Sequence, residues 1–405
     1  MNSVAIIGAG LSGLTLALAL HQQNIPSTIY ESRPAPLNIG GAVMLSPNAL
    51  KVLNALGLYE RIRTKGYNFE YLEYRDHSGE VIETQEFGSE SKYGFKGLRI
   101  YRHVLITELL GMLKENDLPI VFGKKFAKVT DETEQGVTWE FTDGTTESAS
   151  ILIGADGIHS TVRKYLYPNL TPTFTGMAGI TAAVPTAQLK LPPNYHIPVT
   201  LTSSKGGFVI APQQIDGSEV LIGKQLRLED RDRAGWDAFF ADKEALVAVL
   251  QRDNELLPAF VHNATSHIDH AKINVWPFYV VPKLEKWTSP NRRVVILGDA
   301  AHAIPPSAGQ GINQAFEDVY VLALLMGTRG VDGKAALDFW LSYRQARIEK
   351  VLALNRQIDL RRVPGGGEGS EEGLVEREPI ELGWLYEVDF RRDVWTWVGE
   401  QKQEV

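Results

Sequence analysis

Three glycine-containing motifs carry the residues of this chain that are best suited to chemistry. Gly8-Ala9-Gly10-Leu11-Ser12-Gly13 lies near the start, Gly154-Ala155-Asp156-Gly157 in the middle, and Gly298-Asp299-Ala300-Ala301-His302 late in the chain. The first motif alone is typical of dinucleotide-binding sites. All three in this order indicate a ligand much longer than a mononucleotide, held by distant parts of one chain.

The first motif lies within a predicted strand–helix–strand unit. Val4–Ile7 has the pattern of a buried parallel strand, Leu11–Asn24 of a helix, and Ser27–Glu31 of a second strand. In such a unit the glycines permit a tight turn and a close approach of a pyrophosphate to the helix N-terminus. Glu31, at the end of the second strand, would accept hydrogen bonds from ribose hydroxyls. Since its charge would repel a 2′-phosphate, we expect this site not to hold NADP.

The other two motifs each place an aspartate at the end of a predicted strand. Asp156 follows residues 150–153, and Asp299 follows residues 292–297. Ligands of open α/β sheets bind at these carboxyl ends. After Asp299 the chain runs through small residues into a predicted helix, Ile312–Met326, whose N-terminus would stabilise a developing negative charge.

Three ionisable residues near the third motif are expected to be structural. Glu317 and Asp318 are interpreted as partners of backbone N–H groups and arginines rather than as catalytic acids. His302 is a weaker candidate for a base or a metal ligand, because no second ligand stands at suitable spacing. We therefore expect no metal site, and no general base can be named.

Composition limits the class of protein. The 405 residues are enough for two or three domains, and 44% of them are hydrophobic, enough for a large core. The formal net charge of −8 argues against nucleic acid as a partner. The absence of cysteine excludes disulfides and thiolate chemistry. Neither a signal peptide nor a transmembrane run is evident, so a cytoplasmic protein is expected.

The last part of the chain has an unusual composition. Residues 364–373 are rich in glycine and glutamate and predict a mobile loop. Three tryptophans follow it, at positions 384, 395 and 397. We expect this aromatic tail to pack back on the body of the protein.

Together the motifs resemble the single-component FAD-dependent aromatic hydroxylases, which share the fold of para-hydroxybenzoate hydroxylase. The resemblance rests on the first motif with Glu31, on Gly154–Arg163, and on Gly298–His302 with Gly309-Gln310-Gly311-x-Asn313. It covers residues 1 to about 350. Two segments are most similar to the salicylate-hydroxylase-like branch, namely Gly41–Ala49 and Trp276–Tyr279.

The resemblance implies an α/β fold. A Rossmann-like FAD-binding domain would be interleaved with a mixed β-sheet substrate domain and followed by a C-terminal helical tail. The expected ranges are 1–70, 97–174 and 271–350 for the FAD-binding domain, 71–96 and 175–270 for the substrate domain, and 351–405 for the tail.

The resemblance also implies which residues hold FAD. These are Gly8, Gly10, Leu11, Ser12, Gly13, Glu31, Arg33, Gly41, Ala42, Arg102, Asp156, Asp299, Pro305, Gly309, Gly311, Ile312 and Asn313. Arg102 would contact the phosphate and ribityl region, and Asp299 a ribityl hydroxyl. Asp156 and Arg163 would serve both FAD and the nicotinamide cofactor. Since there is no second fingerprint, NADPH or NADH would bind only transiently.

The activity implied by the resemblance is a monooxygenase reaction. One atom of O2 would be inserted into an electron-rich substrate through a flavin C4a-hydroperoxide. The substrate pocket is expected between the flavin and the mixed sheet, lined by Thr181, Phe208, Ile210, Ile222 and Pro306. Thr181 stands where many relatives carry an arginine. The sequence therefore favours a neutral, bulky aromatic or alkene substrate, of the kind found in secondary metabolism.

Other functions stay open at this point. An epoxidase or an antibiotic-modifying monooxygenase would share all these motifs. A flavin-dependent halogenase shares the first motif, and Trp395-Thr396-Trp397 is similar to part of a halogenase signature. A non-catalytic FAD-binding protein is a further class. A monomer and a homodimer are equally compatible with the sequence.

Overall fold

The computed structural model describes residues 3–36, 41–362 and 380–402. Its first layer is a five-stranded parallel sheet with the order β18-β12-β1-β2-β8. The predicted strand–helix–strand unit is confirmed, because β1 and β2 pair in parallel on either side of α1 in the chain. The strands are β1 (Val4–Ile7), β2 (Ser27–Glu31), β8 (Ile120–Phe122), β12 (Ile151–Gly154) and β18 (Val294–Ile296).

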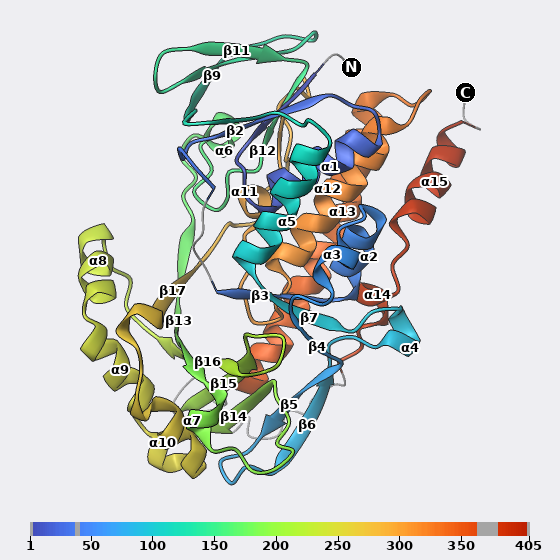
Figure 1. The fold of residues 1–405 in the computed structure, drawn as a ribbon. Helices are drawn as coiled ribbons and strands as arrows, with labels where there is room; N and C mark the ends of the chain where they lie inside the picture. The colour runs from blue at the N-terminus through green and yellow to red at the C-terminus, as the bar shows by residue number, and fades with distance from the viewer. Residues whose placement is uncertain (1–2, 37–40, 363–379, 403–405) are drawn as a thin grey trace.

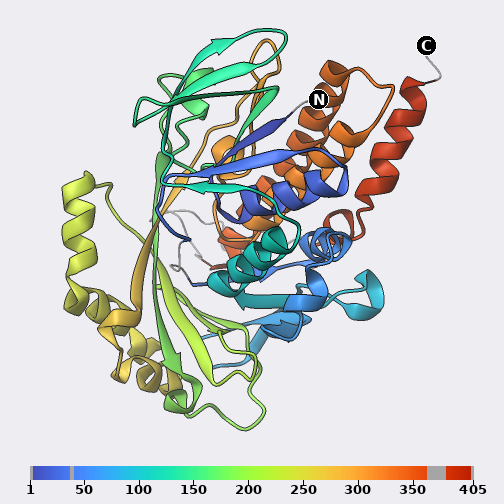
Figure 2. The same cartoon turned by 45° about the horizontal axis from the view of Figure 1, so that its top comes forward.

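Long helices pack beside this sheet. α1 packs against α5 and α12, and α12 packs in turn against α13 and α15 (Figures 1 and 2). Residues of α1 are buried all round its first turns, which explains its nearly unbroken apolar sequence. The helices are α1 (Leu11–Gln22), α5 (Arg102–Glu115), α12 (Gly311–Gly327), α13 (Gly333–Arg362) and α15 (Phe390–Gln401).

The second layer is a seven-stranded mixed sheet with the order β17-β13-β16-β15-β14-β5-β6. Only β14 and β5 pair in parallel. β15 and β16 form an antiparallel hairpin around Asp216-Gly217. The strands are β5 (Tyr71–Arg75), β6 (Val81–Glu86), β13 (Thr173–Pro185), β14 (Val199–Ser203), β15 (Gly206–Pro212), β16 (Glu219–Arg227) and β17 (Ile273–Val280).

A small antiparallel sheet, β3-β7-β4, connects the two layers. It consists of β3 (Ala42–Leu45), β7 (Gly97–Tyr101) and β4 (Tyr67–Phe69). Leu98 and Ile100 of β7 belong to the core of the first layer. Arg99 and Tyr101 alternate with them and therefore project the other way, where they bond Gln213 and Glu219 of the seven-stranded sheet.

The remaining elements are short or peripheral. A three-stranded sheet combines β9 (Phe126–Glu132), β10 (Val137–Phe141) and β11 (Thr146–Ala149). The other helices are α2 (Pro47–Ala55), α3 (Tyr59–Ile62), α4 (Glu90–Tyr93), α6 (Arg163–Leu166), α7 (Thr186–Leu189), α8 (Arg233–Ala241), α9 (Lys243–Gln251), α10 (Ala259–Ser266), α11 (Asp299–His302) and α14 (Gly383–Tyr386). Two 3₁₀ turns span Asn254–Leu256 and His270–Lys272.

This arrangement confirms the predicted fold class, including a helical C-terminal part. The predicted domain boundaries stay a prediction. Trp397 stacks on Phe339 of α13, with ring centroids 4.6 Å apart, whereas Trp395 is exposed. The predicted loop 364–373 lies outside the described residues. Within the described ranges, none of the helices has the length and apolar character needed to cross a bilayer.

Three residues predicted to line the substrate pocket have a different place. Phe208, Ile210 and Ile222 are fully buried in a closed core under α9 and α10, together with Leu246 and Val261. The prediction was wrong because successive strand residues face opposite sides of a sheet, and the sequence does not show which side a helical layer covers.

A network of buried charges joins α12 to α13. Glu317 accepts hydrogen bonds from Arg344 and from Arg347, the latter at 2.5 and 2.9 Å. Asp318 accepts from Arg344 at 2.7 Å and from the backbone N–H of Gly298 at 2.9 Å. The prediction that these two acids are structural is therefore confirmed.

The network also sets the protonation state of its acids. Burial alone would raise the pKa of Glu317 and of Asp318. The opposing charges of Arg344, Arg347 and His302 outweigh that effect, so both pKa values lie below the ordinary value. The carboxylates are thus ionised at neutral pH and depend on their cations.

Replacement of one cation tests this dependence. Among the described residues, Arg344→Met removes the arginine partner of Asp318 and one of the two arginine partners of Glu317, and we expect the free energy of unfolding to fall by about 3–5 kcal/mol at neutral pH. The deficit should shrink as the pH falls toward 4, because the mutant acids can then take up protons and lose their unpaired charge, whereas the wild-type acids, whose pKa values lie below the ordinary value, stay ionised and paired. Thermal unfolding at several pH values measures both effects.

Arg356→Met is the matched control. Arg356 lies on the same helix and is exposed, so we expect a change within about 0.5 kcal/mol. Equal losses in the two variants, or a deficit for Arg344→Met that does not vary with pH, would contradict the structural role assigned to the network.

Candidate active site

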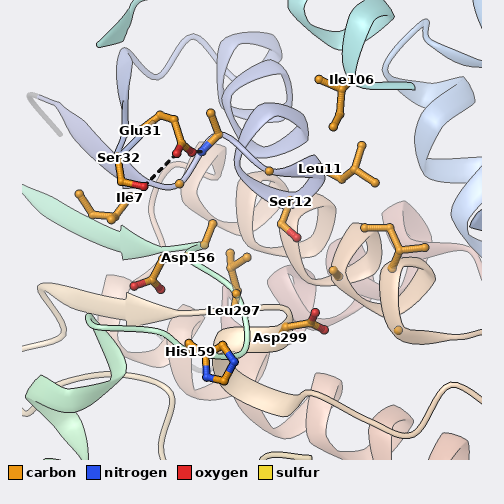
Figure 3. A pocket seen from close by; sticks show the side chains of 18 of the residues that line it. Ile7, Leu11, Ser12, Glu31, Ser32, Ile106, Asp156, His159, Leu297 and Asp299 are labelled. Carbon is orange, nitrogen blue, oxygen red and sulfur yellow. Dashed lines mark hydrogen bonds between the residues drawn. The ribbon is translucent and has the colours of Figure 1, made fainter. Parts of the chain in front are cut away.

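A cavity of about 640 Å³ opens at the carboxyl ends of β1, β2 and β12 (Figure 3). It brings all three motifs together. Most of the residues predicted to hold the cofactor line it: Gly8, Gly10, Leu11, Ser12, Glu31, Arg33, Arg102, Asp156, Asp299, Gly309, Gly311 and Ile312. Pro306, predicted as a substrate residue, lines it as well. The predicted residues that do not line it are Gly13, Gly41, Ala42, Pro305 and Asn313.

The first motif shapes one wall of the cavity. Gly8 has a φ of +109°, and a Cβ atom there would lie 2.6 Å from the carbonyl oxygen of Ala155. A Cβ atom on Gly13 would lie 2.0 Å from the carbonyl oxygen of Gly8. Gly13 thus lets α1 approach β1 without itself reaching the ligand. Since the first bond of α1 runs from the N–H of Leu14 to Gly10, the preceding N–H groups are available to a phosphate.

Glu31 is anchored at one end of the cavity. Its carboxylate accepts the backbone N–H groups of Ala9 at 2.9 Å and Arg33 at 2.8 Å, and the Ser32 hydroxyl at 3.0 Å. Figure 3 shows the carboxylate beside the turn of the first motif. This is a fixed acceptor of the kind that binds ribose hydroxyls.

Asp299 and Arg102 line the cavity away from Glu31. Neither side chain makes a hydrogen bond or an ion pair with another described residue. Asp299 faces the open cavity but is otherwise enclosed by protein. This enclosure raises the pKa of its carboxyl group, and the nearby His302 and Arg102 act in the opposite direction. Burial likewise lowers the pKa of Arg102, and the charge of Asp299 opposes that shift. An acid and a base left without partners in one cavity fit a ligand that carries hydroxyls and phosphates.

The second motif holds the segment after β12 in place. One oxygen of Asp156 accepts the N–H groups of Thr161 at 2.8 Å and Val162 at 3.1 Å, and the other oxygen has no partner within the described part of the chain. Arg163, which was predicted to serve both cofactors, is buried and donates to the carbonyls of Ala300 and Ile158. It does not line the cavity, and it ties the second motif to the third.

The N-terminus of α12 forms the far end of the cavity. Its first intrahelical bond runs from the N–H of Gln314 to Gln310, so the N–H groups of Gly311 and Ile312 are left for a ligand. The side chain of Asn313 is fully used within the protein. It accepts the N–H of Ser46 at 3.0 Å and donates to the carbonyls of Met44 and Gly309.

Asn313 therefore positions the loop and β3, and its amide is not free to bind a cofactor. His302 is also structural, since its Nε2 lies 2.5 Å from Asp318 and its ring packs on Trp287.

Some lining residues were missed by the sequence analysis. Lys124, Lys125 and Phe126 follow β8 and line the cavity near Glu31. Their signal was available, because they follow the carboxyl end of another parallel strand. His159, two residues after the second motif, and Met44 of β3 also line the cavity.

Comparisons with known proteins agree with this geometry. A family model described as an FAD-binding domain matches residues 1–355. The chain is 30% identical over 363 residues to the 3-amino-4-hydroxybenzoate 2-monooxygenase PtnB3 of Streptomyces platensis, with 87% of each chain covered. It is 29% identical over 384 residues to the hispidin-3-hydroxylase of Neonothopanus nambi, with 87% of each covered. A solved salicylate hydroxylase substrate complex shares the fold, with a TM-score of 0.77, 22% identity and 97% of each chain covered.

The fold and the cavity define an FAD-binding enzyme. More particularly, the chain belongs to the family of FAD-dependent aromatic hydroxylases and is a monooxygenase of that kind.

The placement of FAD can be tested at both ends of the cavity. Glu31→Ala and Asp299→Ala each remove a charged acceptor, and we expect FAD binding to weaken by roughly 1.5–3 kcal/mol in each variant. Fluorescence titration of the apoprotein with FAD gives the affinities. Glu147→Ala, an exposed acid on β11, is the control and should bind FAD as the wild type does. Full retention of FAD by both cavity variants would show that the ligand lies elsewhere.

Proposed function

We propose that this enzyme uses FAD and NADPH or NADH to insert one oxygen atom from O2 into an electron-rich aromatic substrate. The observation that carries the proposal is the single cavity that joins Glu31, Asp299 and the N-terminus of α12. When bound, FAD supplies the redox chemistry that connects the reductant to O2. The protein residues bind and orient the cofactor and substrate, and exclude water from the reacting centre.

Each end of the cavity has a distinct role in this proposal. Glu31 holds the adenosine ribose, and the start of α1 holds the pyrophosphate. Arg102 and Asp299 hold the phosphate and ribityl region. The free N–H groups at Gly311 and Ile312, with the α12 dipole, stabilise negative charge on the flavin ring. Because these donors belong to a packed helix, they are oriented before the reaction starts.

The nicotinamide cofactor needs a different kind of binding. The first strand–helix–strand unit is committed to FAD, and the chain contains no second glycine fingerprint. NADPH or NADH would therefore dock transiently at the surface of the protein, deliver its hydride and leave.

The substrate would lie between the cavity and the seven-stranded sheet. Thr181 and Val209 are half-buried on the face opposite α9 and α10, which makes that face the available wall. The names of similar proteins specify hydroxylated aromatic rings, including a benzoate and hispidin. Thr181 by itself favours a neutral substrate, whereas the buried Arg99 on the facing wall favours an anionic one. Both hydroxylation and epoxidation are compatible with a substrate bound at this face of the sheet.

Isotope labelling tests the reaction type. The purified protein, supplied with FAD, NADPH or NADH and a panel of phenols, should form a product that carries one oxygen atom from ¹⁸O2. Mass spectrometry of the product and a peroxide assay measure the outcome. Reductant consumption that yields labelled hydrogen peroxide alone, with every substrate left unchanged or merely dehydrogenated, would mean that the enzyme is an oxidase.

A further inference from the structure

Arg99 is a buried arginine that the cofactor site does not use. It lies in the middle of β7, and only 6% of its surface is exposed. Its Nη2 donates to the Oε1 of Gln213 at 2.8 Å, and its buried Nε has no partner among the residues that the structure describes. No carboxylate of the described residues lies within ion-pair distance of the guanidinium.

Two other buried arginines of this protein have counter-charges, and a third has two neutral acceptors. Arg344 and Arg347 share the carboxylates of Glu317 and Asp318, and Arg163 donates to two carbonyls. Arg99, by contrast, has one neutral hydrogen-bond partner, the side-chain amide of Gln213. Burial of a charge without a counter-charge costs several kcal/mol of stability. Burial also lowers the pKa of Arg99 to about 10, which leaves the guanidinium charged at neutral pH.

The position of Arg99 relates it to the cavity. In the small sheet it pairs with Met44 of β3 on one side and with Tyr67 of β4 on the other. Met44 lines the cavity, so Arg99 lies about 5 Å, one strand spacing, from a lining residue. Met44 and Tyr67 pack on a cluster that includes Phe87, and Phe87 lies beside Gly309 at the far end of the cavity.

The partner of Arg99 relates it to the seven-stranded sheet. Gln213 directly follows β15, and strand alternation places residues 209, 211 and 213 on one face. Val209 pairs with Gly223 of β16, and Gly223 pairs in turn with Thr181 of β13. Arg99 therefore approaches the same face that carries Thr181, from the opposite wall. The N–H of Gln213 bonds the carbonyl of Glu219, which is level with Pro185, so Arg99 reaches this face four residues along β13 from Thr181. A positive charge from β7 is thus present beside this face.

We propose that Arg99, held in place by Gln213, is a substrate-binding residue that recognises a carboxylate or phenolate on the aromatic substrate. The inference rests on the proposed function and adds to it the class of substrate, an anionic aromatic ring. The carboxylate of an aromatic acid would provide the counter-charge that Arg99 lacks among the described residues. The cluster with Phe87 and Tyr67 would contact the aromatic ring of that substrate. The neutral substrate expected from Thr181 alone is replaced by this proposal.

Matched pairs of ligands test the proposal on the FAD-loaded enzyme. Salicylate and salicylamide differ in charge but hardly in shape, and so do 4-hydroxybenzoate and 4-hydroxybenzamide. We expect calorimetry to show that the wild type binds at least one acid about tenfold or more tightly than its amide. Arg99→Gln should abolish this preference and leave the amide affinity within about twofold, whereas Arg99→Lys should retain part of it.

A structural role for Arg99 would give a different result. Tyr101→Phe removes the neighbouring hydrogen bond to Glu219 and is the matched control for contact between the sheets. It should keep the preference for acids. Arg99→Gln should melt at or above the wild-type temperature, because a costly buried charge is lost. A lower melting temperature combined with equal weakening of acid and amide would show that Arg99 only links the sheets.

The remaining outcomes separate this inference from the proposed function. FAD-loaded enzyme that oxygenates phenols but binds amides as tightly as acids contradicts the role of Arg99 alone. A preference for acids that persists in Arg99→Gln contradicts it as well. So does a failure of all four ligands to bind. A protein that takes up no FAD, or makes only hydrogen peroxide, contradicts the proposed function, while calorimetry still measures the preference for acids.

Discussion

The buried ion pairs between α12 and α13 are the constraint on which the cavity depends. Glu317 and Asp318 are adjacent in sequence and fully buried, so their charges are tolerated only because arginines and backbone groups surround them. Glu317 also accepts from Asn48 at 2.6 Å, and Asp318 from the N–H of Gly298. One network thus fixes α12, the start of α2 and the turn of the third motif.

The same network determines the geometry of the cavity. The N-terminus of α12 points into it because the body of the helix is held by Arg344, and Asn313 ties the first turn to β3 and Gly309. The start of α1 approaches from the other side because Gly13 permits contact with β1. A long anionic cofactor bound in this cavity would therefore meet two helix N-termini whose positions are set by packing, with Asp299 and Arg102 also lining the cavity.

The substrate side follows from which face of the seven-stranded sheet is covered. Helices α9 and α10 enclose Phe208, Ile210 and Ile222, which leaves the face with Thr181 as the proposed wall of the substrate site. The opposite wall is the small sheet, where Arg99 alternates with core residues and reaches toward Gln213. In the proposed substrate site, the positive charge would thus come from a residue far in sequence from the strand that carries Thr181.

The sequence by itself determined the cofactor half of the protein. The spacing of glycines and acids in three motifs requires a local backbone geometry, so Glu31, Asp156, Asp299 and the start of α12 could be placed on one cavity from residue types alone. The structural role of Glu317 and Asp318 could also be predicted, because ionised acids within an apolar helix need partners when they are buried, but only the structure shows that Arg344 and Arg347 are those partners. Only the tertiary structure decided the substrate half. Alternating strand residues look alike in sequence, and whether Ile222 or Thr181 faces the cofactor depends on where separate helices pack. The sequence alone does not single out Arg99, because only the structure shows that it is buried and that no acid of the described residues pairs with it.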